Sequence, residues 1–298
     1  MEYHNPVLLK ETVDGLNIHP DGVYVDVTFG GGGHSREIMS RLGENGKLFA
    51  FDQDLDALKN AINDERFTLI NENFRFIKRF LRFHGIKQVD GILADLGVSS
   101  HQFDVAERGF STRFDAELDM RMNQKGDISA YHVVNEYDEQ DIARVLFDYG
   151  ELKNARAMAN VIVTARKDKE IRNSDELKKV LAKFLPGHKS NKILAQIYQA
   201  IRIEVNQEME VLKEFLEQSL EILKPGGRLS VISYHSLEDR LVKRFVKNGM
   251  FEGEPERDFF GNFEVPFKTI EKLIVPTEEE IAINNRARSA KLRVAEKI

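Results

Sequence analysis

The chain has 298 residues, of which 42% are hydrophobic and 31% are charged, with a formal net charge of −6 and no cysteine. The lack of cysteine excludes disulfides and thiolate metal sites, and it is typical of a cytoplasmic protein. No apolar run reaches the roughly 18 residues that a membrane span needs, and the first residues lack the pattern of an export signal. The negative charge argues against a nucleic-acid coat, although it is compatible with a local basic groove.

Apolar runs and helical patterns alternate over the first hundred or so residues. This alternation predicts a mostly parallel sheet with right-handed crossovers. The runs do not alternate strictly between apolar and polar residues, which suits strands covered on both faces. The expected strands are 23–29, 47–52, 67–70 and 89–95, and the expected helices are 5–18, 35–42, 54–62 and 75–84.

The pattern becomes purely helical after Gly97, with expected helices at 139–147, 152–166, 174–185 and 192–205. The α/β pattern then returns with a helix at 208–223, a turn at 224–227, a strand at 228–234, a helix at 237–247 and a closing antiparallel pair at 273–275 and 291–295. The predicted fold class is therefore α/β, Rossmann-like and mostly parallel, with an all-helical insertion. Residues 1–105 and 207–298 would form one discontinuous domain, and residues 106–206 would form the insertion.

Four glycines, Gly30–Gly33, separate the first expected strand from a helical pattern that starts at Ser35. A strand, a glycine turn and a helix N-terminus allow the backbone to approach a polar ligand. A phosphate-binding P-loop is excluded because no lysine follows, and a dinucleotide fingerprint fits poorly because Ser35 replaces its third glycine. The remaining interpretation is a site for S-adenosylmethionine (SAM), in which an acid, here Asp26, precedes the turn.

Two further acids follow expected strands. Asp52 ends the second strand, where it would accept two charge-assisted hydrogen bonds from ribose hydroxyls, and Asp95 ends the fourth strand, where it would border the reaction site. Each acid taken alone favours a solvated strand end over a binding role. Three acids at the carboxyl ends of successive strands favour a SAM site, because ligands of open α/β sheets bind there.

Two other side chains, His34 and Phe74, have two interpretations each, and Gln102 has one. His34 could help the backbone N–H groups of Gly32 and Gly33 to hold the methionine carboxylate, or it could cap the helix. Phe74 could pack on adenine or belong to the core. Gln102 would be a surface amide by default.

Seven motifs together carry a resemblance that runs from about His4 to Ala295. They are Asp26–Ser35, Asp95–Gln102, Glu107–Ser111, Leu118–Met122, Gln199–Asn206, Ser233–Arg240 and Asn285–Ser289. In these motifs the chain resembles the bacterial 16S rRNA cytosine-N4 methyltransferases, the RsmH or MraW family. One departure is His101, where relatives are expected to carry proline.

The resemblance implies a class I SAM-dependent methyltransferase that modifies the exocyclic N4 of a cytidine in the decoding (P-site) region of 16S rRNA. It implies cofactor contacts at seven residues: Gly32, Gly33, His34, Asp52, Phe74, Asp95 and Gln102. It requires no metal and no membrane. The substrate would be 16S rRNA, either naked or within the small ribosomal subunit. The insertion is the expected substrate-recognition domain, and it could also mediate homodimerisation.

The expected catalytic residues are Asp95, Ser99, Ser100 and His235. Asp95 and the serine loop would orient the cytosine amine, while His235 and its neighbour Tyr234 would stack on or bond to the target base. A hydrogen-bonded loop histidine is an equally good interpretation of His235. Two other functions stay open: a non-catalytic SAM-binding regulator, and an amine methyltransferase with a different acceptor. The absence of a Pro-Pro-aromatic loop disfavours the usual DNA amine enzymes.

Basic residues gather in three stretches, and each is typical either of a solvated face or of a nucleic-acid contact. The stretches are Lys78, Arg79, Arg82 and Lys87; Lys178, Lys179, Lys183, Lys189 and Lys192; and Arg286, Arg288, Lys291 and Arg293.

Overall fold

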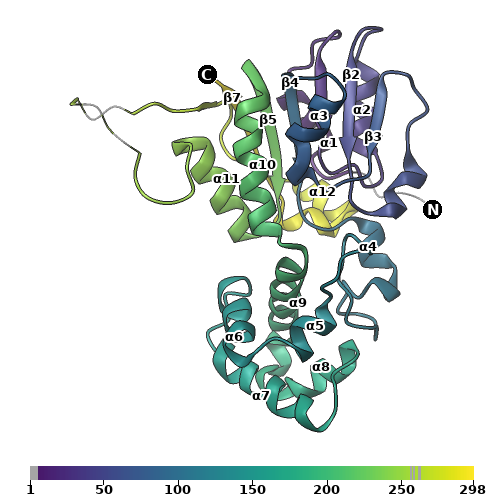
Figure 1. Ribbon diagram of the computed structural model, residues 1–298, viewed down its shortest axis with the longest axis vertical. Coiled ribbons are helices and arrows are strands. Elements are labelled where there is room, and N and C mark those ends of the chain that lie inside the picture. Colours follow the sequence, from purple (N-terminus) through teal and green to yellow (C-terminus); the bar gives the residue numbers. More distant parts are fainter. Residues whose placement is uncertain (1–5, 256, 258, 261–262) are drawn as a thin grey trace. The chain divides into compact units, whose positions relative to one another are not determined.

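The computed structural model describes residues 6–255, 257, 259–260 and 263–298. The expected helix at 5–18 and the resemblance that starts at His4 therefore begin outside the described residues. The chain divides into two compact units, which are residues 1–97 with 209–298, here called the sheet unit, and residues 98–208, here called the helical unit (Figure 1).

The described part of the sheet unit forms a seven-stranded sheet in the order β3-β2-β1-β4-β5-β7-β6. Strands β1 to β5 pair in parallel, whereas β7 is antiparallel to both β5 and β6. The strands are β1 (Val23–Asp26), β2 (Lys47–Phe51), β3 (Phe67–Ile70), β4 (Val89–Asp95), β5 (Leu223–Ser233), β6 (Phe267–Thr269) and β7 (Lys291–Lys297).

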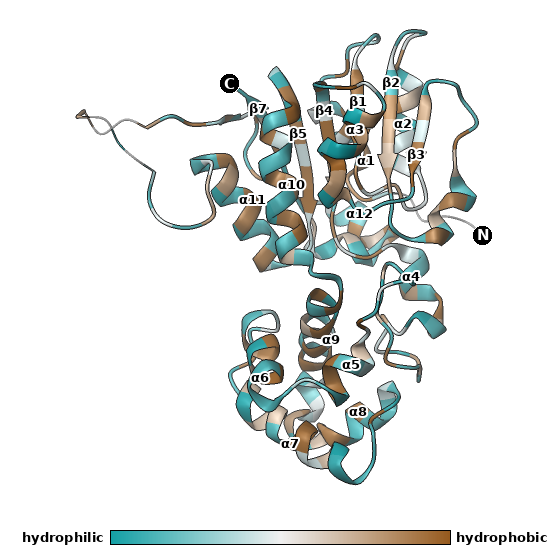
Figure 2. Cartoon of the chain, in the orientation of Figure 1, coloured by the Kyte–Doolittle hydropathy of each residue, from teal (hydrophilic) through white to brown (hydrophobic). Residues whose placement is uncertain are grey.

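Alternate side chains of the central strands enter two different hydrophobic layers. Val25 and Ile92 pack with helices α3, α10 and α11 on one face, while Tyr24 and Leu93 pack with α1 and α2 on the other. Figure 2 shows the apolar colouring of β1, β4 and β5 that results from covering both faces. The helices of this unit are α1 (Leu9–Gly15), α2 (Gly33–Arg41), α3 (Ile77–Phe83), α10 (Glu208–Ile222), α11 (Ser236–Asn248) and α12 (Glu278–Ile283).

The helical unit is built around α9 (Ser190–Asn206), whose residues Ile197 and Ile201 are buried in its core. Short 3₁₀ turns, including Ala182–Phe184 and Gly187–Lys189, connect its last two helices. The remaining helices of this unit are α4 (Ser100–Asp104), α5 (Ala130–Asn135), α6 (Glu139–Asp148), α7 (Ala155–Asp168) and α8 (Ser174–Val180). Its only strand-like feature among residues 98–208 is an isolated bridge between Glu117 and Asn173.

The predicted Rossmann-like class with a helical insertion is confirmed, and several local predictions need correction. The expected helix at 54–62 is a 3₁₀ helix, Leu55–Asn60, because Asp54 caps it tightly and the backbone is extended again at Ala61. The expected turn at 224–227 lies inside β5, as a break in pairing with β4. The closing pair forms mainly between β6 and β7, and the predicted segment 273–275 contributes one bridge, from Ile274 to Leu292.

The boundaries of the compact units differ from those expected for the domains. The helical unit begins at Val98 rather than at 106, and it ends at Glu208 rather than at 206. Val98 and Phe103 pack against the hydrophobic core of the helical unit, which explains the earlier start. Composition could not indicate this, because two apolar side chains do not by themselves reveal which core receives them. Among the described residues, no helix has the length and apolarity that a membrane crossing requires.

Candidate functional site

Three acids lie at one edge of the sheet, as the sequence predicted. Asp26 pairs with Ala50 of β2 and with Leu93 of β4. Asp52 lies two residues after Ala50, and Asp95 lies two residues after Leu93. The carboxyl ends of β1, β2 and β4 therefore meet at this edge, which is where ligands of open α/β sheets bind.

The glycine turn between β1 and α2 depends on backbone conformations that favour glycine. Gly30 and Gly32 have φ values of 50° and 76°, and Gly32 is the N-cap of α2. A Cβ on Gly32 would also lie 2.8 Å from Cζ of Phe29. No side chain caps α2 and its first turn contains no acid. The N–H of Gly32, which was expected to hold the carboxylate with that of Gly33, already donates to the carbonyl oxygen of Phe29 at 2.7 Å. Among the described residues, the N–H groups of Gly33 and His34 have no hydrogen-bond acceptor. The positive end of α2 is therefore suited to a carboxylate.

Asp52 is a half-buried carboxylate that only backbone groups hold. Its Oδ2 accepts a hydrogen bond from the N–H of Gly30 at 2.8 Å, and its Oδ1 accepts one from the N–H of Asp54 at 2.8 Å. Burial raises the pKa of Asp52 to about 6, while these two N–H groups act in the opposite direction. An ionised carboxylate has about four lone-pair positions, so each oxygen can still accept one hydroxyl. This arrangement fits the ribose of a nucleoside cofactor.

Asp26 and His34 form a buried polar layer beneath the glycine turn. Ser35 donates its hydroxyl to Oδ2 of Asp26 at 2.7 Å, and the N–H of Thr28 donates to Oδ1 at 3.0 Å. Burial raises the pKa of Asp26 and lowers that of His34, although each partly counteracts the shift of the other. Nε2 of His34 lies 3.1 Å from the carbonyl oxygen of Val7, so Nε2 carries the proton of the neutral ring. His34 therefore interacts with two groups: electrostatically with Asp26 in the buried layer, and by a hydrogen bond with the backbone of Val7.

Asp95 is fixed from two directions. Its N–H donates to Oγ1 of Thr28 at 2.7 Å, and its Oδ1 accepts the hydroxyl of Tyr234 at 2.7 Å. Burial raises the pKa of Asp95 to about 7; the Tyr234 hydroxyl lowers it, and Glu238 raises it. Oδ2 faces Nδ1 of His34 at 3.8 Å, which is too long for a hydrogen bond. The carboxylate therefore keeps one oxygen available to a ligand.

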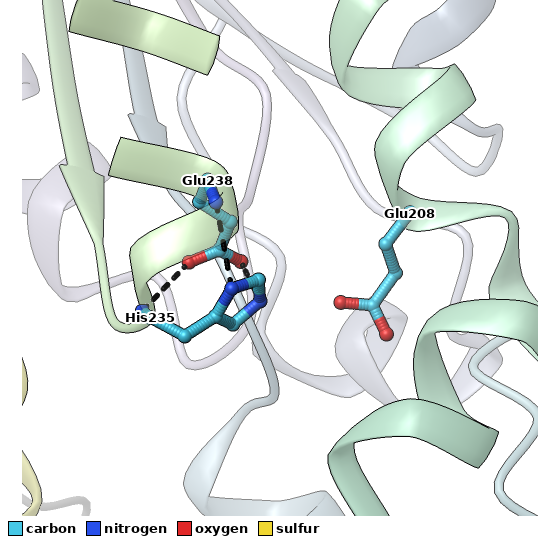
Figure 3. Close-up of side chains that lie close together, drawn as sticks. All are labelled: Glu208, His235 and Glu238. Atoms are coloured by element: carbon cyan, nitrogen blue, oxygen red, sulfur yellow. Dashed lines mark hydrogen bonds and ion pairs between the residues drawn. The ribbon is translucent and has the colours of Figure 1, made fainter. Parts of the chain in front are cut away.

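The turn between β5 and α11 is stabilised by Glu238, which is 2% exposed. Its Oε2 accepts the N–H of Tyr234 at 2.8 Å and that of His235 at 3.3 Å, while its Oε1 lies 3.1 Å from Nε2 of His235. Figure 3 shows the His235 ring and the Glu238 carboxylate facing each other in the first turn of α11. His235 is the N-cap of this helix, so the interpretation as a hydrogen-bonded loop histidine describes its contacts here.

The other expected site residues have structural contacts of their own. Phe74 packs edge-on against Phe215, with ring centroids 5.3 Å apart. In the helical unit, Ser99 and Gln102 form a capping box at the start of α4: the Ser99 hydroxyl accepts the Gln102 N–H at 3.2 Å, and Oε1 of Gln102 accepts the Ser99 N–H at 3.0 Å. Gln102 is 4% exposed, so the default assignment as a surface amide is wrong. Ser100 is the first residue of α4.

Sequence reasoning missed three side chains that organise this edge: Thr28, Ser35 and Glu238. Thr28 connects the acids of β1 and β4, because its N–H reaches Asp26 and its hydroxyl receives the N–H of Asp95. Nothing in the sequence around Thr28 indicates this link. Glu238 did carry a signal, since an acid three residues after a cap position is the pattern of a capping box.

Comparison with known proteins identifies close relatives over the full length. The profile of the MraW methylase family matches residues 1–298. A protein of Flavobacterium johnsoniae named ribosomal RNA small subunit methyltransferase H is 82% identical over 100% of this chain and 99% of its own length. The proteins with the same name from Christiangramia forsetii and Bacteroides thetaiotaomicron are 68% and 58% identical over 100% of this chain, and over 99% and 98% of their own lengths.

Two solved structures show distant similarity to this chain. A crystal structure described as an rRNA methylase from Streptococcus thermophilus has a TM-score of 0.45 and 13% identity, over 100% of this chain and 99% of its own. A putative rRNA methylase from Clostridium thermocellum has a TM-score of 0.45 and 15% identity, over 98% of both chains. Similarity at this level carries no inference about the site.

Proposed function

The chain belongs to the MraW methylase family, and from that membership we propose that it methylates the exocyclic N4 of a cytidine in the decoding region of 16S rRNA. SAM is its cofactor, and its fold is that of the class I SAM-dependent methyltransferases. The substrate is ribosomal RNA of the small subunit, either free or assembled, in the cytoplasm. The helical unit is the proposed substrate-recognition domain. Homodimerisation stays a prediction.

The observation that supports this proposal most is the hydrogen bonding of Asp95. Its N–H and its Oδ1 are both engaged, by Thr28 and by Tyr234, while Oδ2 is available. The N4 amine of cytosine is a poor nucleophile because its lone pair is delocalised into the ring. An acceptor that takes one amine N–H and holds the nitrogen in line favours the tetrahedral geometry that methyl transfer needs, and such positioning can supply up to ~7–11 kcal/mol in ideal cases.

The residues at the sheet edge fit the cofactor. Asp52 would accept the ribose hydroxyls, and the N–H groups of Gly33 and His34 would receive the methionine carboxylate at the start of α2. SAM supplies an electrophilic methyl group on a sulfonium when it is bound. Phe74 beside the adenine and Gln102 near the sulfonium complete the proposed cofactor contacts.

Asp95 acts in this scheme as an ionised acceptor and needs little strength as a base. Once the nitrogen is methylated it carries a positive charge and becomes acidic, so its proton leaves readily. Ser99 and Ser100 stay predicted catalytic residues. His235 would contact the base from the turn that Glu238 holds rigid, and Tyr234 would act through Asp95. The target base must be unstacked to reach these groups.

Methyl transfer from labelled SAM tests the proposal directly. Small ribosomal subunits, free 16S rRNA and DNA serve as acceptors, and the modified nucleoside is identified after digestion. We expect label in N4-methylated cytidine of 16S rRNA. Label on DNA alone would identify a different amine acceptor, and SAM binding without any transfer would favour the non-catalytic regulator.

A further inference from the structure

The end of α8 and the start of α9 present an unusual charge distribution. Residues 177–203 contain no aspartate or glutamate, although the chain as a whole has 49 acids against 43 lysines and arginines. Within this run Lys179, Lys183, His188, Lys189 and Lys192 are exposed. We call these five side chains the lysine segment. Three of the lysines, Lys183, Lys189 and Lys192, are the ones to substitute in a test of its role.

Several cations of the helical unit outside the lysine segment pair with neighbouring acids. Lys178 pairs with Asp175 at 3.0 Å, and Arg202 pairs with Glu208 at 2.8 Å. By contrast, Lys183, Lys189 and Lys192 form no ion pair with any carboxylate in the part of the chain that the structure describes. Nζ of Lys183 lies over the ring of Phe184, 5.0 Å from its centroid, and this contact does not neutralise its charge.

The acid nearest to the lysine segment already has other partners. Glu176 accepts the N–H of Arg172 at 2.8 Å and also pairs with Lys169. These two contacts lower the pKa of Glu176, and Lys179 adds a smaller effect in the same direction. Glu176 therefore does not neutralise the segment as a whole.

Folding does not account for the position of these lysines. Lys189 is the N-cap of the long helix α9 and forms no side-chain cap, and the first turn of α9 contains no acid. Cations at a helix N-terminus oppose the helix dipole. In the same unit, α6 begins after a capping Asp138 and α8 after a capping Asn173, and both helices carry two acids in their first turn. Helix α7 also lacks a side-chain cap and an acid in its first turn, so α9 and α7 differ from α6 and α8 in this respect.

We propose that the lysine segment is an RNA-binding surface that contacts the phosphate backbone of the substrate. This inference rests on the proposed function and assigns it a specific contact. Exposed, unpaired lysines match the sequence-independent charge of an RNA backbone, and such contacts position the nucleic acid without reading its bases. They also resolve the conflict between a net charge of −6 and a polyanionic substrate, because the attraction is local.

The test compares two triple variants with equal loss of charge. The first combines Lys183→Gln, Lys189→Gln and Lys192→Gln. The control combines Lys125→Gln, Lys153→Gln and Lys167→Gln, which are exposed lysines elsewhere in the helical unit. Dissociation constants for 16S rRNA and for small ribosomal subunits are measured at several salt concentrations, together with methyl-transfer kinetics, SAM affinity and thermal stability.

We expect the first variant to bind RNA about 10-fold to 30-fold more weakly, with a salt slope reduced by about 2 to 3. KM for RNA should rise while kcat and SAM affinity stay unchanged, and thermal stability should be equal or higher because repulsion at the start of α9 is removed. Equal weakening in the control, or unchanged RNA affinity in the first variant, would overturn the inference. If the unmodified protein neither binds nor methylates the RNA, the proposed function itself fails, which is a separate result.

Discussion

The carboxyl edge of the sheet and the lysine segment differ in almost every physical respect. At the sheet edge, buried or half-buried acids are held by backbone N–H groups and hydroxyls, and the pKa values of Asp26, Asp52 and Asp95 are raised. In the lysine segment the lysine charges are exposed, and none of them forms an ion pair with a carboxylate among the residues that the structure describes. The first environment suits a cationic sulfonium and an amine, and the second suits a polyanion. One chain thus separates the chemistry of methyl transfer from the electrostatics of RNA attraction.

This contrast also explains why the two regions tolerate change differently. Two acids of the sheet edge share a partner, because Thr28 contacts both Asp26 and Asp95, so a substitution of one should alter the geometry and the pKa of the other. The lysines act additively through the solvent and should be lost one at a time without structural damage.

The largest expected effect is that of Asp95→Asn. The amide keeps the shape of the side chain but loses the charged acceptor, so we expect kcat to fall by about 10²-fold to 10⁴-fold. SAM affinity should change far less, because the contacts of Asp52 and α2 are untouched. Single-turnover methyl transfer and equilibrium SAM binding separate the two effects. Full turnover in this variant would remove Asp95 from the mechanism.

The next effect concerns the cofactor. Asp52→Asn removes the charge from the two hydrogen bonds proposed to the ribose, and hydrogen bonds to charged groups contribute about 1.5–3 kcal/mol each. We expect the dissociation constant of SAM to rise by about 10-fold to 100-fold, with kcat at saturating SAM little changed. Asp21→Asn, at an exposed turn, is the control and should bind SAM normally. Calorimetry measures both, and equal affinity in the two variants would contradict the ribose contact.

Most of the sheet edge could be predicted from the sequence, because strand ends are local features. Buried runs that end in Asp26, Asp52 and Asp95 fix the acids on one edge once the strands are taken as parallel. The hydrogen bonds that tune these acids are not local. The Tyr234 hydroxyl reaches Asp95 across 139 positions of sequence, and Thr28 reaches it across 67. No short-range pattern encodes such pairings.

The sequence predicted the long helices of the helical unit, but it did not predict where the unit begins and ends. The amphipathic repeats of α6 and α9 locate these helices to within a few residues. The short helix α4 was missed because its five residues, Ser100–Asp104, are held by the capping box of Ser99 and Gln102 rather than by an apolar face. The lysines of the lysine segment were visible in the sequence as a run of positive charge. Whether acids neutralise them depends on the fold and could not be predicted.

A smaller effect is expected for Tyr234→Phe. The Tyr234 hydroxyl lowers the pKa of Asp95, which burial raises to about 7. Since Asp95 must be ionised to accept an amine proton, kcat/KM at subsaturating SAM should rise with pH through a midpoint near 7. Removing the hydroxyl should move this midpoint upward and lower the rate at pH 7 by about tenfold. A pH profile with an unchanged midpoint would show that Tyr234 does not act through Asp95.

The smallest effect is on stability. The pKa values of Asp52 and Asp95 are about 6 and about 7 in the folded protein against an ordinary value of 3.8. The folded state therefore binds protons that the unfolded chain has released, so the stability from these groups is complete below pH 3.8 and is lost as pH rises through 6 and 7. Asp95→Asn abolishes one such group. The decrease in Tm between pH 5 and pH 8, measured without SAM, should therefore be smaller in this variant than in the unmodified protein, by about 2 to 4 °C. Asp21→Asn should keep the slope of the unmodified protein, and parallel slopes in all three would mean that Asp95 ionises normally.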